Sequence, residues 1–378
     1  MKILLAPDKF RGSLEAPQVC EAMAEGIRMV SSEIEVVSLP MADGGEGTLD
    51  LLLWYSGGKK QFAKVQDPLG RTIEAEYGIS ADSKTAFIEM ATASGLRLLK
   101  SEERNPLKTS TFGTGELIKI VVESGVENII LGIGGSATTD AGIGMAAALG
   151  WQFLDVDGKE LKPIGENLVK IKEIKQPTLP LYKTSLNIKV ACDVTNPLFG
   201  ESGAAYIYGP QKGADKEAVE LLDKGLQNIA EVFNKDFGKD YAQIAGTGAA
   251  GGLGFGLMSF VNAELKEGVK LLMDFCDFDK NLKEVSLIIT GEGKIDSQTL
   301  QGKLIKGITD KATHIKIPIV AICGTLDVSP KELQEIGINY ATSILNRPMN
   351  LEDALKYGYE GVRNATFYLV NLLHKSND

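Results

Sequence analysis

Cysteine is scarce in this chain and is nowhere clustered. The four cysteines, at positions 20, 192, 276 and 323, lie far apart and form no Cys-x-x-Cys pair. This spacing argues against a structural zinc site and against a disulfide framework. Reduced and mostly buried thiols in a cytosolic protein are the simplest interpretation.

Histidine is rarer still, and only His314 and His374 occur. Both lie in or near predicted C-terminal helices, away from the glycine-rich loops described below. Catalytic triads that use histidine, and metal sites built from several histidines, are therefore not expected. A general base in this protein would have to be a carboxylate or a lysine.

Long apolar runs and an excess of positive charge are also missing. No stretch approaches the ~20 apolar residues of a membrane-spanning helix, and the N-terminal run Ile3–Ala6 is too short for a signal peptide. The net charge of −10 provides no attraction toward a nucleic-acid backbone or an anionic membrane. We expect neither as a partner, and we expect the cytoplasm as the location.

Glycine, by contrast, is abundant, with 42 residues against 13 prolines. That ratio is typical of many tight loops in which the backbone must approach another group closely. The length of 378 residues predicts about two to three domains.

Strands and helices alternate at both ends of the chain. Near the N-terminus we expect strands at residues 3–6 and 35–39 and helices at 16–30 and 48–55. Near the C-terminus we expect strands at 285–290, 317–323 and 340–344 and helices at 299–313, 330–336 and 351–374. Alternation of this kind predicts a parallel sheet with helices on both faces.

The middle of the chain follows a different pattern. We expect antiparallel strands over residues 62–90 with an Asp-Pro-Leu-Gly turn at 67–70, strands at 128–132 and 188–192, and helices at 114–124 and 139–149. Neither end alone has enough strands for a full sheet, but together they supply five.

We therefore predict an α/β protein made of two α/β domains. A discontinuous domain, residues 1–61 plus 286–378, has a flavodoxin- or Rossmann-like parallel sheet, and it is interrupted by an inserted α/β domain, residues 62–285. Two consecutive domains divided near residue 200 are the alternative.

Five loops combine acids with glycine or hydroxyl residues directly after a predicted strand. They cover residues 8–13, 41–48, 132–140, 192–197 and 290–296. Because ligands bind at the carboxyl ends of the strands in open parallel sheets, the loops of each domain should meet at one edge. If the two edges face each other, the active site lies in the cleft between the domains.

Phosphoryl transfer is the chemistry that such loops support best. Glycines let backbone N–H groups surround phosphate oxygens, and one or two carboxylates usually hold magnesium. Lysines neutralise the transferred group while a carboxylate accepts the proton of the acceptor hydroxyl. The sequence therefore predicts an ATP- and magnesium-dependent kinase for a small hydroxy acid, although it contains neither a G-x-x-x-x-G-K-[ST] P-loop nor the H-R-D and D-F-G sequences of protein kinases.

Each loop taken singly also has a simpler interpretation. An acid such as Asp43 or Asp140 alone could be a helix N-cap, and the pair Gly134–Gly135 could merely allow close packing. Residues 246–251 match G-x-G-x-x-G, but no clear strand precedes them and no βαβ unit surrounds them. We interpret that segment as tight packing or as the wall of a cleft.

Seven segments, in order along the chain, resemble the bacterial type 1 glycerate kinase family. They are residues 6–14, 40–48, 132–140, 192–198, 209–214, 246–254 and 290–299, so the resemblance covers essentially the whole chain. The family pattern has Ser-Phe-Lys where this chain has Lys9-Phe10-Arg11. The resemblance implies two α/β domains, one of them flavodoxin-like, with the site between them. It also implies phosphorylation of D-glycerate by ATP to a phosphoglycerate, for which we prefer 2-phosphoglycerate.

The candidate site residues come from these loops. For the nucleotide we expect Gly134, Gly135, Ser136, Thr138, Thr139, Gly248 and Gly251. For magnesium we expect Asp43, Glu46, Glu292 and Asp296. For the substrate we expect Asp8, Lys9, Arg11, Ser13, Asn196 and Lys303. We assign catalysis to Asp193, which would orient or deprotonate the glycerate hydroxyl, and to Lys9, which would act on the moving phosphoryl group.

Two other functions stay open at this point. A small-molecule kinase of the galactokinase–homoserine kinase type has a Gly-Ser phosphate loop that resembles residues 134–137, but the pattern of five parallel strands argues against it. A non-catalytic two-domain sensor of a small hydroxy acid is disfavoured because five acid-bearing loops exceed what binding an anion requires.

Overall fold

The structure is a computed structural model, and it describes residues 1–42, 47–178, 186–300, 303–313 and 315–375. The chain forms two compact units, the first made of Met1–Leu51 and Gly268–Asp378 and the second of Leu52–Glu267. The second unit is inserted into the first, as predicted, and the alternative of two consecutive domains is wrong. No helix in the described part of the chain is long and apolar enough to cross a membrane.

The unit boundaries fall earlier in the chain than the predicted ones, which follow residues 61 and 285. At the first boundary, Leu53 lies beside Gly78 within the second unit. At the second boundary, Val269 and Met273 lie beside Gly307 of the first unit. Side-chain packing of this kind assigns residues 52–61 to the second unit and residues 268–285 to the first, and periodicity along the sequence does not reveal it.

The first unit is built on a five-stranded parallel sheet. Its strands are β1 (Lys2–Leu5), β2 (Glu35–Ser38), β11 (Leu287–Ile295), β12 (Ile319–Leu326) and β13 (Tyr340–Ser343). The order across the sheet is β13-β12-β11-β1-β2, and every neighbouring pair is parallel. Counted along the unit itself, this is the order 2-1-3-4-5 of flavodoxin-like sheets, with the topological switch point between β1 and β11. The predicted fold class is confirmed.

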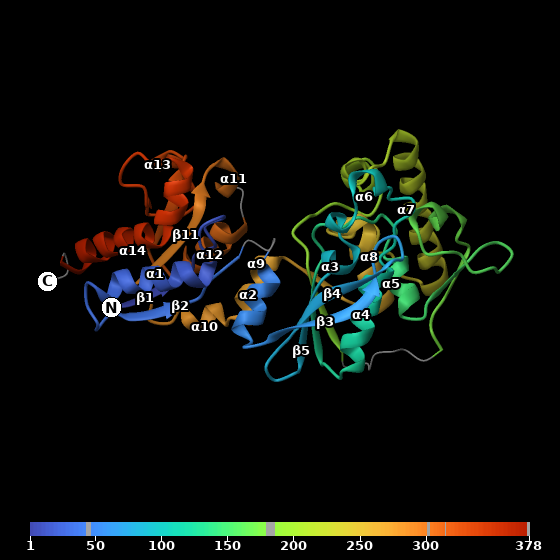
Figure 1. Cartoon of the computed structure of the whole chain (residues 1–378), viewed down its shortest axis with the longest axis horizontal. Coiled ribbons are helices and arrows are strands. Elements are labelled where there is room, and N and C mark those ends of the chain that lie inside the picture. Colours follow the sequence, from blue (N-terminus) through green and yellow to red (C-terminus); the bar gives the residue numbers. More distant parts are fainter. Residues whose placement is uncertain (43–46, 179–185, 301–302, 314, 376–378) are drawn as a thin grey trace. The chain divides into compact units, whose positions relative to one another are not determined.

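Helices cover both faces of this sheet. They are α1 (Ala16–Arg28), α9 (Gly268–Phe275), α10 (Phe278–Asn281), α11 (Ser297–Leu300), α12 (Lys303–Thr313), α13 (Pro330–Glu335) and α14 (Leu351–Lys375), and α2 (Thr48–Tyr55) crosses into the second unit. Helices α1 and α14 lie side by side on one face (Figure 1). Val320 and Ile322 of β12 pack on that side, whereas Ala321 and Cys323 pack toward α12 and α13. Alternate residues of a buried parallel strand thus supply two cores.

One predicted loop of the first unit is in part a strand. The sequence predicts that a strand ends at residue 290 and that a loop covers 290–296, but β11 continues to Ile295. Strand β12 is equally extended and pairs with it as far as Ile295 opposite Leu326. The glycines of this segment and Glu292 therefore lie on the end of a strand, and Asp296 follows directly after it.

The second unit contains a six-stranded mixed sheet. Its strands are β3 (Lys59–Gln66), β4 (Thr72–Ile79), β5 (Thr85–Glu89), β6 (Asn128–Gly132), β9 (Asn187–Ala191) and β10 (Glu264–Lys266), in the order β10-β9-β6-β5-β4-β3. Strands β3, β4 and β5 are antiparallel, which confirms the expectation for this region, and the other pairs are parallel. Strands β7 (Gln152–Leu154) and β8 (Glu173–Lys175) form a separate antiparallel pair.

The helices of the second unit differ most from expectation. They are α3 (Ala91–Ser94), α4 (Phe112–Glu123), α5 (Ile143–Ala148), α6 (Ala204–Tyr208), α7 (Lys216–Phe237) and α8 (Ala249–Val261), with 3₁₀ turns η1 (Leu96–Leu98), η2 (Ser101–Glu103), η3 (Gly165–Lys170) and η4 (Pro210–Lys212). The expected helix at 139–149 begins only at Ile143, because Ala141 and Gly142 both have positive φ. Helix α7 was not predicted from the sequence, although Asp215 caps its start and Gly238, with φ 67°, ends it.

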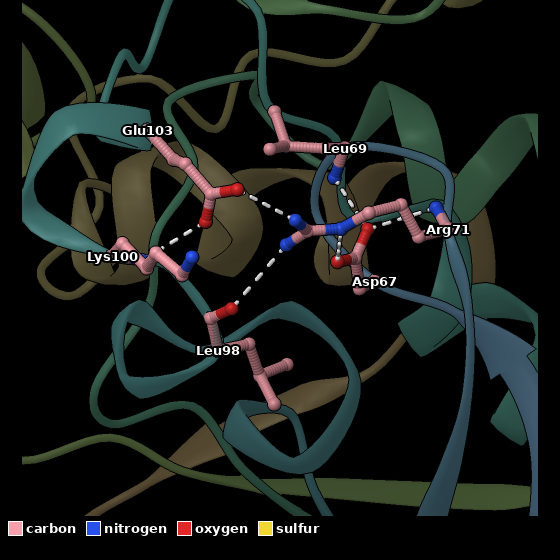
Figure 2. Close-up of polar contacts among 6 residues, drawn as sticks. All are labelled: Asp67, Leu69, Arg71, Leu98, Lys100 and Glu103. Carbon is pink, nitrogen blue, oxygen red and sulfur yellow. Dashed lines mark hydrogen bonds and ion pairs between the residues drawn. The ribbon is translucent and has the colours of Figure 1, made fainter.

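The predicted turn after β3 is confirmed, and Figure 2 shows how it is clamped. The Asp67 carboxylate accepts hydrogen bonds from the backbone N–H of Leu69 at 2.8 Å and of Arg71 at 2.9 Å, and also from the Arg71 guanidinium. Arg71 also donates to the Glu103 carboxylate at 2.7 Å and to the Leu98 carbonyl at 3.4 Å. The β3–β4 turn therefore holds the segment that follows α3 in a fixed place.

Candidate active site

A pocket of about 820 Å³ lies at the carboxyl ends of the strands in the first unit. Its charged lining residues are Asp8, Lys9, Arg11, Glu292, Lys294 and Asp296. The Asp8 N–H donates to the Gly291 carbonyl at 2.8 Å, so the loop after β1 lies directly beside β11 at the topological switch point. Two of the three loops expected at this edge are thus adjacent. Of the third loop, Asp43 and Glu46 lie outside the described residues.

The loop after β1 combines charge with local anchoring. The Asp8 carboxylate accepts a hydrogen bond from the Lys9 N–H at 2.6 Å, and the Ser13 hydroxyl donates to the Leu355 carbonyl of α14 at 2.6 Å. A Cβ on Gly47 would lie 3.3 Å from Lys9 Nζ. The Lys9 ammonium therefore reaches the end of the 41–48 loop, while Arg11 is exposed at the pocket.

The end of β11 carries two of the predicted magnesium ligands. Glu292 and Asp296 are both half-buried and both line the pocket. Asp296 already pairs with Lys294 at 2.9 Å, and the hydrogen bond that the Lys294 ammonium donates to this carboxylate raises the pKa of Lys294. Asp296 also accepts a hydrogen bond from the Thr299 N–H at 3.3 Å, so it helps to start α11.

Within the described residues, no group of three or more His, Cys, Asp or Glu is placed to hold a metal ion. Magnesium in phosphoryl-transfer sites usually takes only one or two carboxylates and completes its shell with water and phosphate oxygens. Glu292 and Asp296 therefore fit this ion by number and by oxygen type. Lys303 is the first residue of α12, and its side chain lies outside the described part of the structure.

Three predicted segments meet in the second unit. The Gly248 N–H donates to the Asn196 carbonyl at 3.0 Å, and the Ala141 N–H donates to the Gly251 carbonyl at 3.1 Å. Gly251 has φ 69°, and a Cβ there would lie 2.0 Å from the Thr138 carbonyl oxygen. Close backbone packing therefore explains this glycine, in agreement with the interpretation of residues 246–251 as a tightly packed segment.

The 132–140 loop is exposed at its tip and buried at its base. Gly134 and Gly135 are exposed, whereas residues 136–140 are buried. Gly135 has φ 71°, and its carbonyl accepts a hydrogen bond from the Leu96 N–H at 2.9 Å, in the segment held by Arg71. Among the described residues, nothing accepts a hydrogen bond from the N–H of Gly134, Gly135 or Ser136. Successive N–H groups around a left-handed residue form a concavity suited to an anion.

Asp140 supports this loop from below. It is fully buried, and its carboxylate accepts hydrogen bonds from Thr111 N–H at 2.7 Å, Thr111 Oγ1 at 2.8 Å, Gly142 N–H at 3.1 Å and Gly144 N–H at 3.2 Å. Burial raises the pKa of the Asp140 carboxyl, and these hydrogen bonds lower it in part. The acid of this loop is therefore a scaffold residue that ties the loop to the start of α4.

The loop after β9 contains the two remaining predicted residues. Asp193 is half-buried directly beyond the end of β9. The Asn196 side chain is engaged within the protein, because Tyr208 Oη donates to its Oδ1 at 2.6 Å and its Nδ2 donates to the Ser202 carbonyl at 2.8 Å. Asn196 thus anchors the loop that presents Asp193.

Lys212 is a further candidate that is not among the predicted site residues. Its side chain is 1% exposed, and its ammonium donates to Ser136 Oγ at 2.8 Å and to the Thr138 carbonyl at 2.6 Å. Burial lowers the pKa of Lys212 to about 7, although the nearby Asp140 carboxylate acts in the opposite direction. The sequence signal that could have identified Lys212 is its position in the 209–214 segment, directly before a glycine. In the structure that glycine, Gly213, has φ 93°.

Comparison with known proteins extends across both units. Residues 3–374 match the glycerate kinase family. A Halalkalibacterium halodurans protein named glycerate kinase is 45% identical over 359 residues, which cover 94% of this chain and 94% of the relative. An Escherichia coli protein named glycerate 2-kinase is 42% identical over 366 residues, covering 97% and 96% of the two chains. The crystal structure of a Salmonella typhimurium protein assigned as glycerate kinase 2 matches 100% of this chain and 99% of its own, with a TM-score of 0.90 and 40% identity.

Proposed function

The chain belongs to the glycerate kinase family, and on this basis we propose that it transfers the terminal phosphoryl group of ATP to a hydroxyl of D-glycerate. The observation that carries the proposal is the family match over residues 3–374, because it includes the acid- and glycine-bearing loops of both units. We further propose the 2-hydroxyl as the acceptor, with support from the name of the Escherichia coli relative. A cytoplasmic location stays a prediction.

The second unit would hold the nucleotide. The exposed tip Gly134–Gly135 and the N–H groups around it suit phosphate oxygens. Gly248 and Gly251 would act indirectly, because their close packing sets the shape of the neighbouring backbone. Thr138 and Thr139 stay candidates for the nucleotide site, and their buried hydroxyls have no partner among the described residues.

The first unit would hold the acceptor. Lys9 and Arg11 line its pocket in a protein of net charge −10, and they would neutralise the glycerate carboxylate or the moving phosphoryl group. Lys303 stays a third candidate for this role. Asp8 would orient the loop through Lys9, and the bond from Ser13 to α14 would keep the loop in place. That these residues meet the nucleotide in a cleft between the domains stays a prediction.

Magnesium, when bound, would neutralise charge on the phosphate oxygens during transfer. Glu292 and Asp296 are the described residues that would hold it, and Asp43 and Glu46 are candidates outside the described residues. Asp193 is our candidate for orienting the acceptor hydroxyl and taking its proton, because no histidine is predicted at these loops.

Phosphorus NMR of the product formed from ATP, magnesium and D-glycerate tests both parts of the proposal. Without proton decoupling, a phosphate on carbon 2 is split by one neighbouring proton into a doublet, and a phosphate on carbon 3 is split by two into a triplet. We expect the doublet, and no new signal when glycerate is left out. A triplet would overturn the position only, whereas the absence of any phosphoglycerate would overturn the proposed reaction.

A further inference from the structure

A lysine lies buried beneath the most glycine-rich loop of the second unit. The Lys212 ammonium contacts two neutral oxygens, Ser136 Oγ at 2.8 Å and the Thr138 carbonyl at 2.6 Å, and forms no ion pair within the described structure. Burying an ammonium group is costly unless it is paired and hydrogen-bonded. An apolar side chain could fill the same space at a lower desolvation cost, so the presence of an ionisable side chain here requires an explanation.

The polar groups of the loop that this ammonium contacts indicate an anion. The N–H groups of Gly134, Gly135 and Ser136 donate to nothing in the described part of the chain. The hydroxyls of Thr138 and Thr139 are buried and likewise have no partner among the described residues. Several donors without a partner, in the same loop that this ammonium contacts, are a feature that a bound anion would satisfy.

We propose that Lys212 is a positioning residue for phosphate binding: its amino group holds the Ser136–Thr138 turn, and in its protonated form it supplies the positive charge that favours the ATP phosphates at the loop tip. This inference rests on the proposed function. Lys212 acts through Ser136, since it is itself buried below the loop.

The surroundings of Lys212 make the proposal measurable. The charged group whose field acts on its ammonium is Asp140. Arg104 lies beside Gly213, the residue that follows Lys212. At the start of the 209–214 segment, Ala205 of α6 and Val219 of α7 lie beside Gly209. Because burial lowers the pKa of Lys212 to about 7, the side chain is largely neutral near pH 8. Bound phosphates would favour the charged form, so ATP binding should take up a proton there.

The test is calorimetric titration of ATP into the full-length protein, without glycerate, in two buffers of different ionisation enthalpy. For the wild type we expect proton uptake that rises between about pH 6.5 and pH 8.5 toward one proton per ATP. For Lys212→Arg we expect ATP binding with no such uptake, because arginine stays charged throughout. For Lys212→Met we expect ATP affinity to fall by about 10- to 100-fold, and no uptake. Lys216→Met, which changes an exposed lysine at the start of α7, is the matched control and should bind ATP as the wild type does.

Two results would overturn the inference. One is wild-type proton uptake equal to that of Lys212→Arg, and the other is unchanged ATP affinity in Lys212→Met. If neither variant folds, Ser136→Ala removes the hydroxyl that Lys212 contacts, and unchanged ATP affinity in that variant contradicts the inference. Failure of the proposed function is a separate result, since it would appear as a wild type that forms no phosphoglycerate.

Discussion

The two units present acids and glycines at the carboxyl ends of parallel strands, yet they use them in opposite ways. In the first unit the charged groups lie at the surface of a pocket and pair with one another, as in Lys294–Asp296, where the side chains are 53% and 22% exposed. In the second unit Asp140 and Lys212 are buried and bond mainly to backbone and hydroxyl groups.

This difference teaches that a motif does not define the role of its acid. Asp140 and Asp296 both follow glycine-containing segments, but Asp140 accepts four hydrogen bonds in a buried site, whereas Asp296 lines a pocket. The first unit offers partly exposed charged side chains at a pocket that suits a small anionic substrate. The second offers a glycine loop whose shape is set in advance by the residues beneath it.

The largest effect should come from Asp193→Asn. We expect kcat to fall by about 10³-fold because the variant cannot accept the proton of the acceptor hydroxyl. ATP affinity should change little, which places the loss in chemistry rather than in the scaffold of the second unit. Steady-state kinetics together with calorimetric ATP binding measure the two separately.

Asp215→Asn, which keeps an N-cap at the start of α7, is the control and should leave kcat unchanged. Near-normal turnover of Asp193→Asn would show that the half-buried acid of the second unit is also a scaffold residue.

The second-largest effect tests the contrast between Asp140 and Asp296. Asp140→Ala should lower the free energy of unfolding by about 3 kcal/mol, because it leaves buried donors at Thr111, Gly142 and Gly144 without an acceptor. Asp296→Ala should change stability little, but it should raise the magnesium concentration needed for half-maximal activity. Urea unfolding and magnesium titrations measure the two effects. Equal losses of stability in both variants would contradict the contrast drawn here.

The smallest effects concern two glycines of the second unit. Gly251→Ala should lower the free energy of unfolding by about 2 kcal/mol, because φ is 69° and the new Cβ would collide with the Thr138 carbonyl. Gly134→Ala should leave stability nearly unchanged, since a Cβ there would have no described atom within 4 Å. If phosphates approach the loop tip closely, Gly134→Ala should still weaken ATP binding. Thermal unfolding with and without ATP distinguishes these outcomes, and unchanged ATP binding would argue against a phosphate at Gly134.

Much of the fold could be read from periodicity. The strand at 128–132 and the helix at 48–55 match the structure residue for residue, and the alternation at both ends predicts the parallel sheet. The late start of α5 could not be predicted, because it depends on left-handed backbone at Ala141, which packing imposes. The extension of β11 was missed because Gly291 and Gly293 resemble loop residues until β12 is seen to pair alongside them.

The candidate site divides in the same way. Which loops carry acids and glycines is a property of the sequence, and so is the resemblance that the family match later confirmed. Whether an acid is a scaffold or lines a pocket depends on burial, which brings together residues far apart in the chain. Asp140 meets Thr111, Asn196 meets Tyr208, and Lys212 meets Ser136 across 76 positions. Only the tertiary structure could decide those roles, because the cost of an unpaired charge is set by its surroundings and not by its neighbours in sequence.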